Sequence, residues 1–163
     1  MLITLTGFMG SGKSTVGRII ADALGCPFMD MDSLIEKKVG KSIPEIFATD
    51  GEAHFRLLEK QLLEQTVKKY AGVDAVLALG GGTAALTGAA ALLREKTLCI
   101  YLQDSLENLR PRLVQAQRPL AGEDLEALLA LREPFYMEAA SIVLPTAGHS
   151  PEEIADEIII SCL

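Results

Sequence analysis

The stretch GFMGSGKST, residues Gly7–Thr15, decides the fold. It follows a short apolar run, Leu2 to Thr6, and from Lys13 it leads into residues whose apolar positions recur at helical spacing. The pattern Gly-x4-Gly-Lys-Ser is that of a nucleotide-binding P-loop, in which backbone N–H groups at the start of a helix converge on phosphate oxygens. The strand before it and the amphipathic helix after it supply the context that the motif requires. We therefore predict a phosphate-binding loop here rather than a glycine-rich turn that only links a strand to a helix.

Each residue type in this motif has a chemical reason. Lys13 is expected to reach the outer phosphates of a nucleotide, and the Ser14 hydroxyl is expected to bind Mg²⁺. The residues predicted to contact the nucleotide here are Gly10, Ser11, Gly12, Lys13, Ser14 and Thr15.

The composition limits the class of protein. With 163 residues, of which 49% are hydrophobic, the chain is long enough for one domain, residues 1–163, with a substantial core. A net charge of −7 argues against nucleic acid as a partner, because such binding depends on clustered Lys and Arg. The three cysteines, Cys26, Cys99 and Cys162, have no metal-ligand or disulfide spacing, which favours buried thiols in a reducing compartment. With no signal peptide and no membrane-spanning run, we expect a cytoplasmic protein with no membrane partner.

Strand and helix signals alternate along the chain, which is typical of a parallel sheet covered by helices on both faces. Short, uniformly apolar runs predict strands that are buried on both sides. The predicted strands are residues 2–6, 27–29, 75–79, 97–102 and 142–144. The predicted fold class is α/β, a three-layer αβα arrangement with a five-stranded parallel sheet of the P-loop NTPase type.

Helix signals fill the intervals between these strands. A capping box begins a short helix at Ser42, and a longer helix is predicted over residues 52–69 with Phe55, Leu58 and Leu62 on its buried face. Pro111 is expected to interrupt a helix. Residues 115–124 are polar and irregular, which predicts a mobile loop, or lid.

Two carboxylates, Asp30 and Asp32, follow the second predicted strand. Ligands bind at the carboxyl ends of the strands in open parallel sheets, so this pair is placed to meet a metal ion and a hydroxyl group. In kinase chemistry one carboxylate orders magnesium and its water, and the other accepts the proton of the acceptor hydroxyl. A competing interpretation is that Asp32, which precedes Ser33-Leu34-Ile35, caps a helix.

Gly80-Gly81-Gly82 follow the third predicted strand, where glycines allow close approach to the backbone. A ligand can lie against such a segment, although a flexible turn has the same sequence. This strand end carries no acidic residue for magnesium, so Asp30 is nominated in its place, together with Ser14.

Three arginines are candidates for binding anions. Arg56 and Arg132 lie in mostly apolar helical stretches, and a pair of guanidinium groups suits a carboxylated acceptor such as a sugar acid. Arg118, within the predicted lid, suits a cation that reaches over the phosphates. Each of the three has the alternative of being a solvated surface residue.

Other P-loop classes fit less well. A GTPase switch needs an Asn-Lys-x-Asp segment that reads the base, which the loops lack, and a motor needs additional modules. A kinase that acts on a small molecule remains.

Together these motifs occur in the order and at the spacing of one family, and the chain resembles the shikimate kinases over nearly its whole length. The segments that carry the resemblance are the P-loop to Gly17, Asp30-Met31-Asp32, Ile46 to Glu52 with Phe55-Arg56, Leu79 to Gly82, Arg118-Pro119-Leu120, and Arg132-Glu133-Pro134-Phe135-Tyr136. The resemblance implies a five-stranded fold of the nucleoside-monophosphate-kinase type. It also implies transfer of the terminal phosphoryl group of ATP to the 3-hydroxyl of shikimate, on the pathway to chorismate and aromatic amino acids.

The resemblance also implies how the substrate is held. Asp32 would bind the shikimate hydroxyls and act as the base, and Arg56 and Arg132 would bind the carboxylate. Gly80, Gly81 and Gly82 would pack on the ring, and Glu59 would orient the substrate-binding arginine.

On the nucleotide side, the resemblance implies that Lys13 and Arg118 neutralise the charge of the transferred phosphoryl group, with Ser14 and Asp30 binding Mg²⁺. The family usually has an arginine near the nucleotide at the position of Pro111. Either Arg110 or Arg112 could take its role, and the choice is left open here. In the loop on the adenine side, Leu144-Pro145-Thr146 replace the Asp-Thr pair that is usual in the family, so the contacts to the base and the ribose are left open. We expect a monomer whose small-molecule partners are shikimate and ATP.

Two rival interpretations remain at this point. A gluconate kinase would also pair a P-loop with a sugar acid, but would lack the Gly-Gly-Gly and Phe-Arg combination. A ligand sensor without turnover would keep the fold, although the presence of Asp32, Lys13 and Arg118 argues against it.

Overall fold

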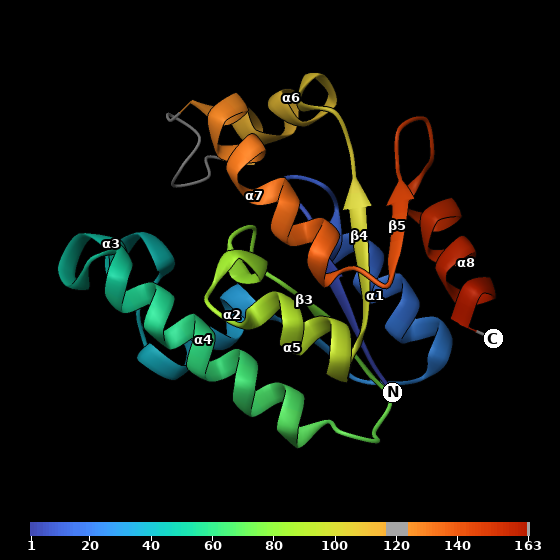
Figure 1. Ribbon diagram of the computed structural model, residues 1–163, viewed down its shortest axis with the longest axis horizontal. Helices are drawn as coiled ribbons and strands as arrows, with labels where there is room; N and C mark the ends of the chain where they lie inside the picture. Colours follow the sequence, from blue (N-terminus) through green and yellow to red (C-terminus); the bar gives the residue numbers. More distant parts are fainter. Residues whose placement is uncertain (117–123, 163) are drawn as a thin grey trace.

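Within residues 1–116 and 124–162, which the computed structural model describes, five parallel strands form a sheet in the order β2-β3-β1-β4-β5 (Figure 1). The strands are β1 (Leu2–Thr6), β2 (Phe28–Asp30), β3 (Ala75–Ala78), β4 (Leu98–Gln103) and β5 (Ile142–Pro145). The predicted five-stranded parallel sheet is confirmed, with strand ends that differ from the prediction by one residue. β1 lies at the centre and pairs with both β3 and β4, so the loop that follows β1 emerges in the middle of the sheet edge.

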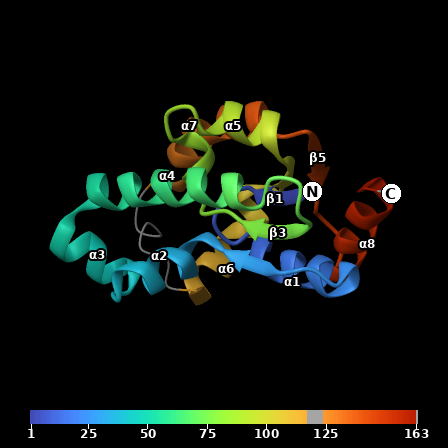
Figure 2. The same ribbon diagram turned by 90° about the horizontal axis from the view of Figure 1, so that it is seen from below.

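Helices cover both faces of this sheet. They are α1 (Lys13–Leu24), α2 (Met31–Val39), α3 (Ile43–Asp50), α4 (Glu52–Lys69), η1 (Thr83–Ala85), α5 (Ala89–Lys96), α6 (Leu106–Ala116), α7 (Leu125–Ala139) and α8 (Pro151–Cys162). Figure 2 shows α4, α5 and α7 on one side of the strands and α1 and α8 on the other, which confirms the three-layer arrangement. Among the described helices, none combines the length and the apolar character needed to cross a bilayer.

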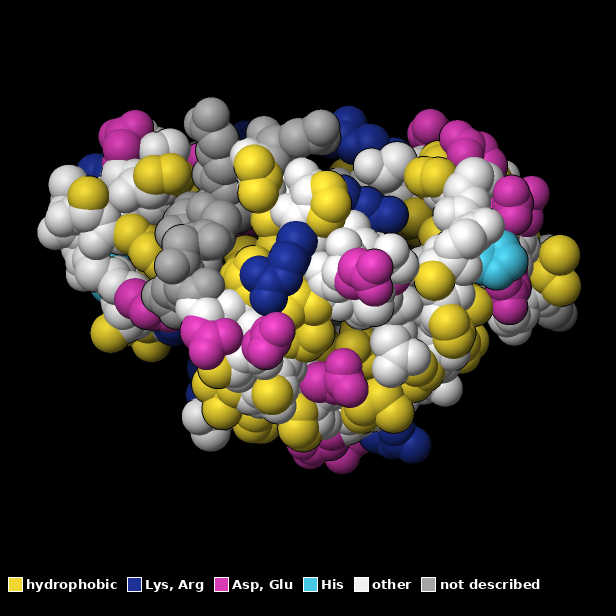
Figure 3. All heavy atoms as spheres, turned by 90° about the horizontal axis from the view of Figure 1, so that it is seen from above, with side chains coloured by type: hydrophobic (Ala, Val, Ile, Leu, Met, Phe, Trp, Pro, Cys, Tyr) yellow, Lys and Arg dark blue, Asp and Glu magenta, His cyan; other side chains and the backbone are white. Residues whose placement is uncertain are grey.

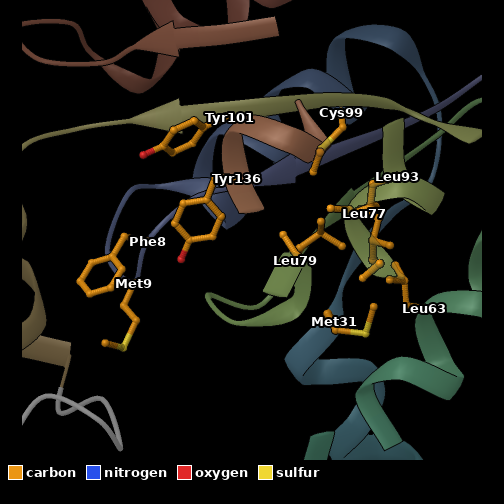
Figure 4. Close-up of a cluster of buried hydrophobic side chains, with 14 of the residues drawn as sticks. Phe8, Met9, Met31, Leu63, Leu77, Leu79, Leu93, Cys99, Tyr101 and Tyr136 are labelled. Carbon is orange, nitrogen blue, oxygen red and sulfur yellow. The ribbon is translucent and has the colours of Figure 1, made fainter. Parts of the chain in front are cut away.

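The alternation of side chains along each strand divides the core between the two faces. In β3, Leu77 packs toward the layer of α4 and α5, whereas Val76 packs toward the layer of α1 and α8. Figure 4 shows Leu77 beside Leu63 of α4 and Leu93 of α5, all three fully buried. Because both faces are apolar, the strand sequences are continuous hydrophobic runs, as parallel sheets require.

The buried face of α4 differs from the prediction. It is centred on Phe55, Glu59 and Leu63, while Leu58 and Leu62 lie half-buried at its margins. The apolar pattern was misleading because a carboxylate, Glu59, occupies the middle of the buried face with 0% of its surface exposed. A buried carboxylate needs hydrogen-bond partners, and the site described below supplies them.

The region around the predicted lid is more helical than expected. α6 continues through Pro111, which is exposed, so the prediction of an interruption there is wrong. Proline removes one intrahelical hydrogen bond, and in an exposed helix water can satisfy the carbonyl left over. Gln115 and Ala116 belong to α6, and Asp124 is the N-cap of α7. The remainder of the predicted lid, including Arg118, lies outside the described residues.

The sequence predicted three buried cysteines, and the structure shows only one of them fully buried. Cys99 of β4 is buried, whereas Cys26 and Cys162 are half-buried, and all three are free thiols. Burial raises the pKa of the Cys99 thiol to about 11, so this side chain acts as a small apolar group in the core.

Close packing of α1 against β2 depends on Gly17. A Cβ at this position would lie 2.7 Å from Cε1 of Phe28 and 3.3 Å from Cδ1 of Leu5. Ser14 lies one helical turn before Gly17, and Asp30 lies two residues after Phe28 on the same side of its strand. The close approach at Gly17 therefore brings Ser14 and Asp30 within hydrogen-bonding reach.

We predict that Gly17→Ala destabilises the fold by about 1 kcal/mol. The clash with Phe28 acts against the gain of about 1 kcal/mol that alanine brings to a helix interior, and overpacking is the larger effect. Urea unfolding of the two proteins measures the difference. In a Phe28→Leu background the same substitution should lose most of its cost, and an equal cost in both backgrounds would mean that the ring is not the cause.

Candidate active site

A cleft of about 460 Å³ lies at the carboxyl ends of the strands, a volume typical of small-ligand sites. Figure 3 looks onto this face, where Lys and Arg side chains lie near the middle and carboxylates lie around them. The predicted site residues that line the cleft are Gly10, Ser11, Gly12, Lys13, Ser14, Thr15, Asp30, Asp32, Arg56, Gly80, Gly81, Gly82 and Arg132. Every described residue predicted for the site is thus brought to one cavity.

The loop between β1 and α1 forms the floor of the cleft. Gly10 and Gly12 have positive φ, and α1 begins at Lys13, so the free N–H groups of a helix N-terminus face the cavity. The Lys13 ammonium donates to the carbonyl oxygens of Gly7 and Phe8, at 2.8 and 2.9 Å. A cation and a helix N-terminus together form an anion-binding site.

Ser14 and Asp30 meet at one wall of the cleft. The Ser14 hydroxyl donates to one oxygen of the Asp30 carboxylate, and the other oxygen accepts from the backbone N–H of Ser33 at 3.2 Å. These are hard oxygen ligands, which suit Mg²⁺, an ion that takes few protein ligands and completes its shell with phosphate and water. The described residues contain no cluster of three or more His, Cys, Asp or Glu side chains that would hold a metal without such help. The pair fits a magnesium ion bound together with a nucleotide.

Asp32 lies in the first turn of α2 and lines the cleft. The N-cap of that helix is Asp30, so the competing interpretation of Asp32 as a cap is wrong. Its Oδ1 would lie 3.3 Å from a Cβ added to Gly80, which places the carboxylate beside the glycine segment. Asp32 is therefore not the N-cap of α2, and it lines the cleft beside the glycine segment.

Two arginines lie close together at the far end from α8. Arg132 of α7 is only 6% exposed, and Arg56 of α4 has a side chain 21% exposed, so neither is an ordinary surface arginine. Burial lowers the pKa of Arg132 from its ordinary value, and the Arg56 cation lowers it further, while Tyr136 and Glu59 act in the opposite direction. The buried Glu59 carboxylate accepts from Nη1 of Arg56 at 2.8 Å. Two neighbouring guanidinium groups, of which Arg56 is bonded to the one buried carboxylate, suit an additional carboxylate from a ligand.

The glycine segment packs against these charged groups. A Cβ on Gly82 would lie 2.6 Å from Nη1 of Arg56, and one on Gly80 would lie 2.8 Å from Oε2 of Glu59. A Cβ on Gly81 would lie 3.5 Å from Nη1 of Arg132. Charged side chains of the protein therefore lie close to Gly80 and Gly82, and Met9 lies closest to Gly81. The approach of a ligand to these glycines stays a prediction.

Two tyrosines support this segment from within the core, and Figure 4 shows them side by side. The Tyr136 hydroxyl donates to the carbonyl oxygen of Gly81 and is also bonded to Arg132. The Tyr101 hydroxyl donates to Glu133 at 3.1 Å. Burial raises the pKa of Tyr136, against the influence of Arg132, and burial together with the Glu133 carboxylate raises the pKa of Tyr101. Tyr136 thus links the glycine segment to one of the arginines.

The cleft is also lined by Arg112 of α6 and by Thr146 and His149, which lie in or next to the loop after β5. The sequence pointed to Arg112 and to the segment that holds Thr146, but not to His149. Arg112 donates to the carbonyl oxygen of Gly10 at 3.1 Å and lies 3.8 Å from the buried carboxylate of Asp104. Arg110 instead lies 3.4 Å from Glu126, away from the cleft. Of the two arginines left open, Arg112 lines the cleft and Arg110 does not; which of them contacts a nucleotide stays a prediction.

Comparisons with known proteins agree with this geometry. A family model described as shikimate kinase matches residues 9–163. The shikimate kinases of Enterococcus faecalis and Zymomonas mobilis are 40% and 42% identical to this chain, covering 96% and 98% of it and 95% and 92% of their own lengths. A structure of shikimate kinase from Acinetobacter baumannii in complex with shikimate has a TM-score of 0.92 at 34% identity, covering 99% of this chain and 92% of that one. The shikimate kinase of Aquifex aeolicus has a TM-score of 0.87 at 34% identity, covering 99% and 96%.

We predict that the buried tyrosines make the fold sensitive to alkali. Above the ordinary tyrosine pKa of about 10 the unfolded chain releases these protons while the folded chain retains them, so the free energy of unfolding falls as the pH rises. Urea unfolding between about pH 8 and 10.5 measures this fall. Tyr136→Phe and Tyr101→Phe should each show a shallower fall than the parent protein, and parallel curves would contradict the assignment.

Proposed function

The chain belongs to the shikimate kinase family, and we propose on this premise which of its residues perform each part of the reaction. The enzyme uses ATP to phosphorylate the 3-hydroxyl of shikimate, a step on the pathway to chorismate. Phosphoryl transfer proceeds through a loose transition state, so catalysis depends mainly on the positions of charges around the reacting groups.

One observation carries the proposal. A single cleft is lined by a P-loop at the start of α1, by a pair of guanidinium groups on α4 and α7, and by the Asp32 carboxylate. This arrangement suits a nucleotide whose terminal phosphate faces a small hydroxylated carboxylate.

In the proposed mechanism, Lys13 and the N-terminus of α1 bind the transferred phosphoryl group and offset its negative charge. Asp32 binds the shikimate hydroxyls and accepts the proton of the 3-hydroxyl as the new bond to phosphorus forms. We assign the base a smaller share of the rate than the positioning groups have, because little proton transfer is needed early in a loose transition state.

Arg56 and Arg132 hold the shikimate carboxylate in this proposal. A planar guanidinium matches a carboxylate with two parallel hydrogen bonds, which fixes the orientation of the ring as well as its position. Glu59 orients Arg56, and Gly80, Gly81 and Gly82 allow the ring and the charged groups to lie close to the backbone.

Mg²⁺ belongs to the same proposal, with Ser14 and Asp30 as its protein ligands. When bound, the ion supplies positive charge to the phosphate oxygens of ATP. Arg112 is assigned to the nucleotide, and Arg118, which lies outside the described residues, to the transferred phosphoryl group. We also propose one domain, a monomer and a cytoplasmic location; the length of 163 residues supports the single domain.

A parallel assay tests the function. ADP release is measured with shikimate, with gluconate and with nucleoside monophosphates, each together with ATP and Mg²⁺. Release with shikimate is the expected result. Release with gluconate alone would reject the assignment, and binding of shikimate without ADP release would favour a sensor.

We predict that Arg56→Ala raises the KM for shikimate by about 10- to 100-fold, since it removes a charged hydrogen-bond donor from the carboxylate. The KM for ATP should change little. Arg110→Ala is the matched control, because Arg110 lies outside the cleft next to Glu126. Unchanged saturation by shikimate in Arg56→Ala would refute the assignment of the carboxylate site.

We predict that Lys13→Ala lowers kcat by at least about a hundredfold, because a preorganised donor to the transferred group is lost. Lys41→Ala is the control, since Lys41 pairs with Asp50 on the surface at 3.4 Å. Steady-state rates at saturating ATP and shikimate measure the effect. A Lys13 variant with near-normal turnover would show that the P-loop does not act on the transferred group.

A further inference from the structure

Both oxygens of the buried Glu59 carboxylate have a partner. Oε1 accepts from Nη1 of Arg56 at 2.8 Å, and Oε2 accepts from the hydroxyl of Thr83 at 2.7 Å. The Glu59 side chain is 1% exposed, so solvent water has almost no access to its carboxylate. A buried charge is retained only where its lone pairs are satisfied, which makes the Thr83 hydroxyl part of what keeps this carboxylate in place.

The position of Thr83 follows from the glycine segment. Thr83 begins η1 directly after Gly82, and its backbone N–H donates to the carbonyl oxygen of Gly80 at 3.2 Å. The side chain is fully buried. A Cβ on Gly80 would lie 2.8 Å from Oε2 of Glu59 and 3.1 Å from the Thr83 hydroxyl, so the missing Cβ leaves room for this bond.

We propose that Thr83 is a positioning residue for the substrate carboxylate, acting through Glu59 on Arg56. With Oε2 held by the hydroxyl, the carboxylate cannot turn about its axis, and Oε1 presents a fixed acceptor to the guanidinium. This inference rests on the proposed function, in which Arg56 binds the carboxylate of shikimate. Thr83 itself makes no contact with the substrate in the proposal.

A fixed Glu59 should reduce the conformational freedom that the Arg56 side chain loses when the substrate binds. Arg56 has a long, flexible side chain, and a second acceptor, Oε1 of Glu52, lies 3.5 Å from its Nη2. Glu52 is exposed, so this contact restrains the guanidinium weakly. A fixed Glu59 holds Arg56 in one position before the substrate arrives, and preorganisation of this kind strengthens binding.

Thr83→Val tests the proposal because valine keeps the shape and removes the hydroxyl. We expect the KM for shikimate to rise about tenfold, the loss typical of one hydrogen bond to a charged group, with kcat and the KM for ATP changing less than about twofold. Thr83→Ser, which retains a hydroxyl, should restore the KM. Thr66→Val is the matched control, because Thr66 is a buried threonine of α4 whose hydroxyl donates to Leu62 of the same helix.

A double-mutant cycle separates positioning from a structural role. In an Arg56→Ala background, Thr83→Val should raise the KM for shikimate no further, because the effect passes through Arg56. An equal increase in both backgrounds would overturn the proposal, as would a normal KM in Thr83→Val itself. If Thr83→Val melts well below the parent protein, Thr83→Ala takes its place in the cycle, with the same criteria.

The outcomes also distinguish this inference from the proposed function. A parent protein without ADP release on shikimate would refute the function. Normal turnover by the parent together with a normal KM in Thr83→Val would refute the positioning role alone.

Discussion

The parallel pairing of β1 with β3, and of β3 with β2, is the constraint on which the site depends. Parallel strands end at the same edge of a sheet, so this pairing places the P-loop, the glycine segment and Asp30 next to one another. The carboxyl ends of three strands thereby form one wall of the cleft. The helices that follow β1 and β2 then present Lys13 and Asp32 to the same space.

A second constraint comes from a charge inside the protein. Glu59 occupies the middle of the buried face of α4, where an apolar residue would be expected, and its two oxygens are bonded to Arg56 and Thr83. Removal of one partner from such an arrangement is costly, because the charge stays buried with a lone pair unsatisfied. The glycines at 80 and 82 leave the space in which this network forms. In the proposed function, binding of an anionic substrate by Arg56 would therefore be coupled to the packing of the core around Glu59.

Much of the fold and of the cleft could be predicted from the sequence, because short-range sequence patterns indicate these features. The P-loop pattern, the capping box at Ser42 and the apolar strands depend on residues close to one another in the chain, and the structure places Ser42 as the N-cap of α3. The apolar pattern of α4 did not show that Glu59 is buried, because one of the groups that bonds its carboxylate, Thr83, lies 24 positions away in the chain. The interruption predicted at Pro111 was wrong, because the missing N–H of one proline did not end the exposed helix α6.

By itself, the sequence determined the fold class, the phosphate-binding loop and the identities of the charged residues in the cleft, because each of these depends on residue type and short-range spacing. Only the tertiary structure decided which partners those residues have. It placed Arg112 rather than Arg110 in the cleft, assigned the capping role to Asp30 rather than Asp32, and linked Thr83 and Tyr136 to the arginine pair. The physical reason is that hydrogen bonds and burial depend on distances between groups that are far apart in the chain, and the packing of helices on the sheet sets those distances.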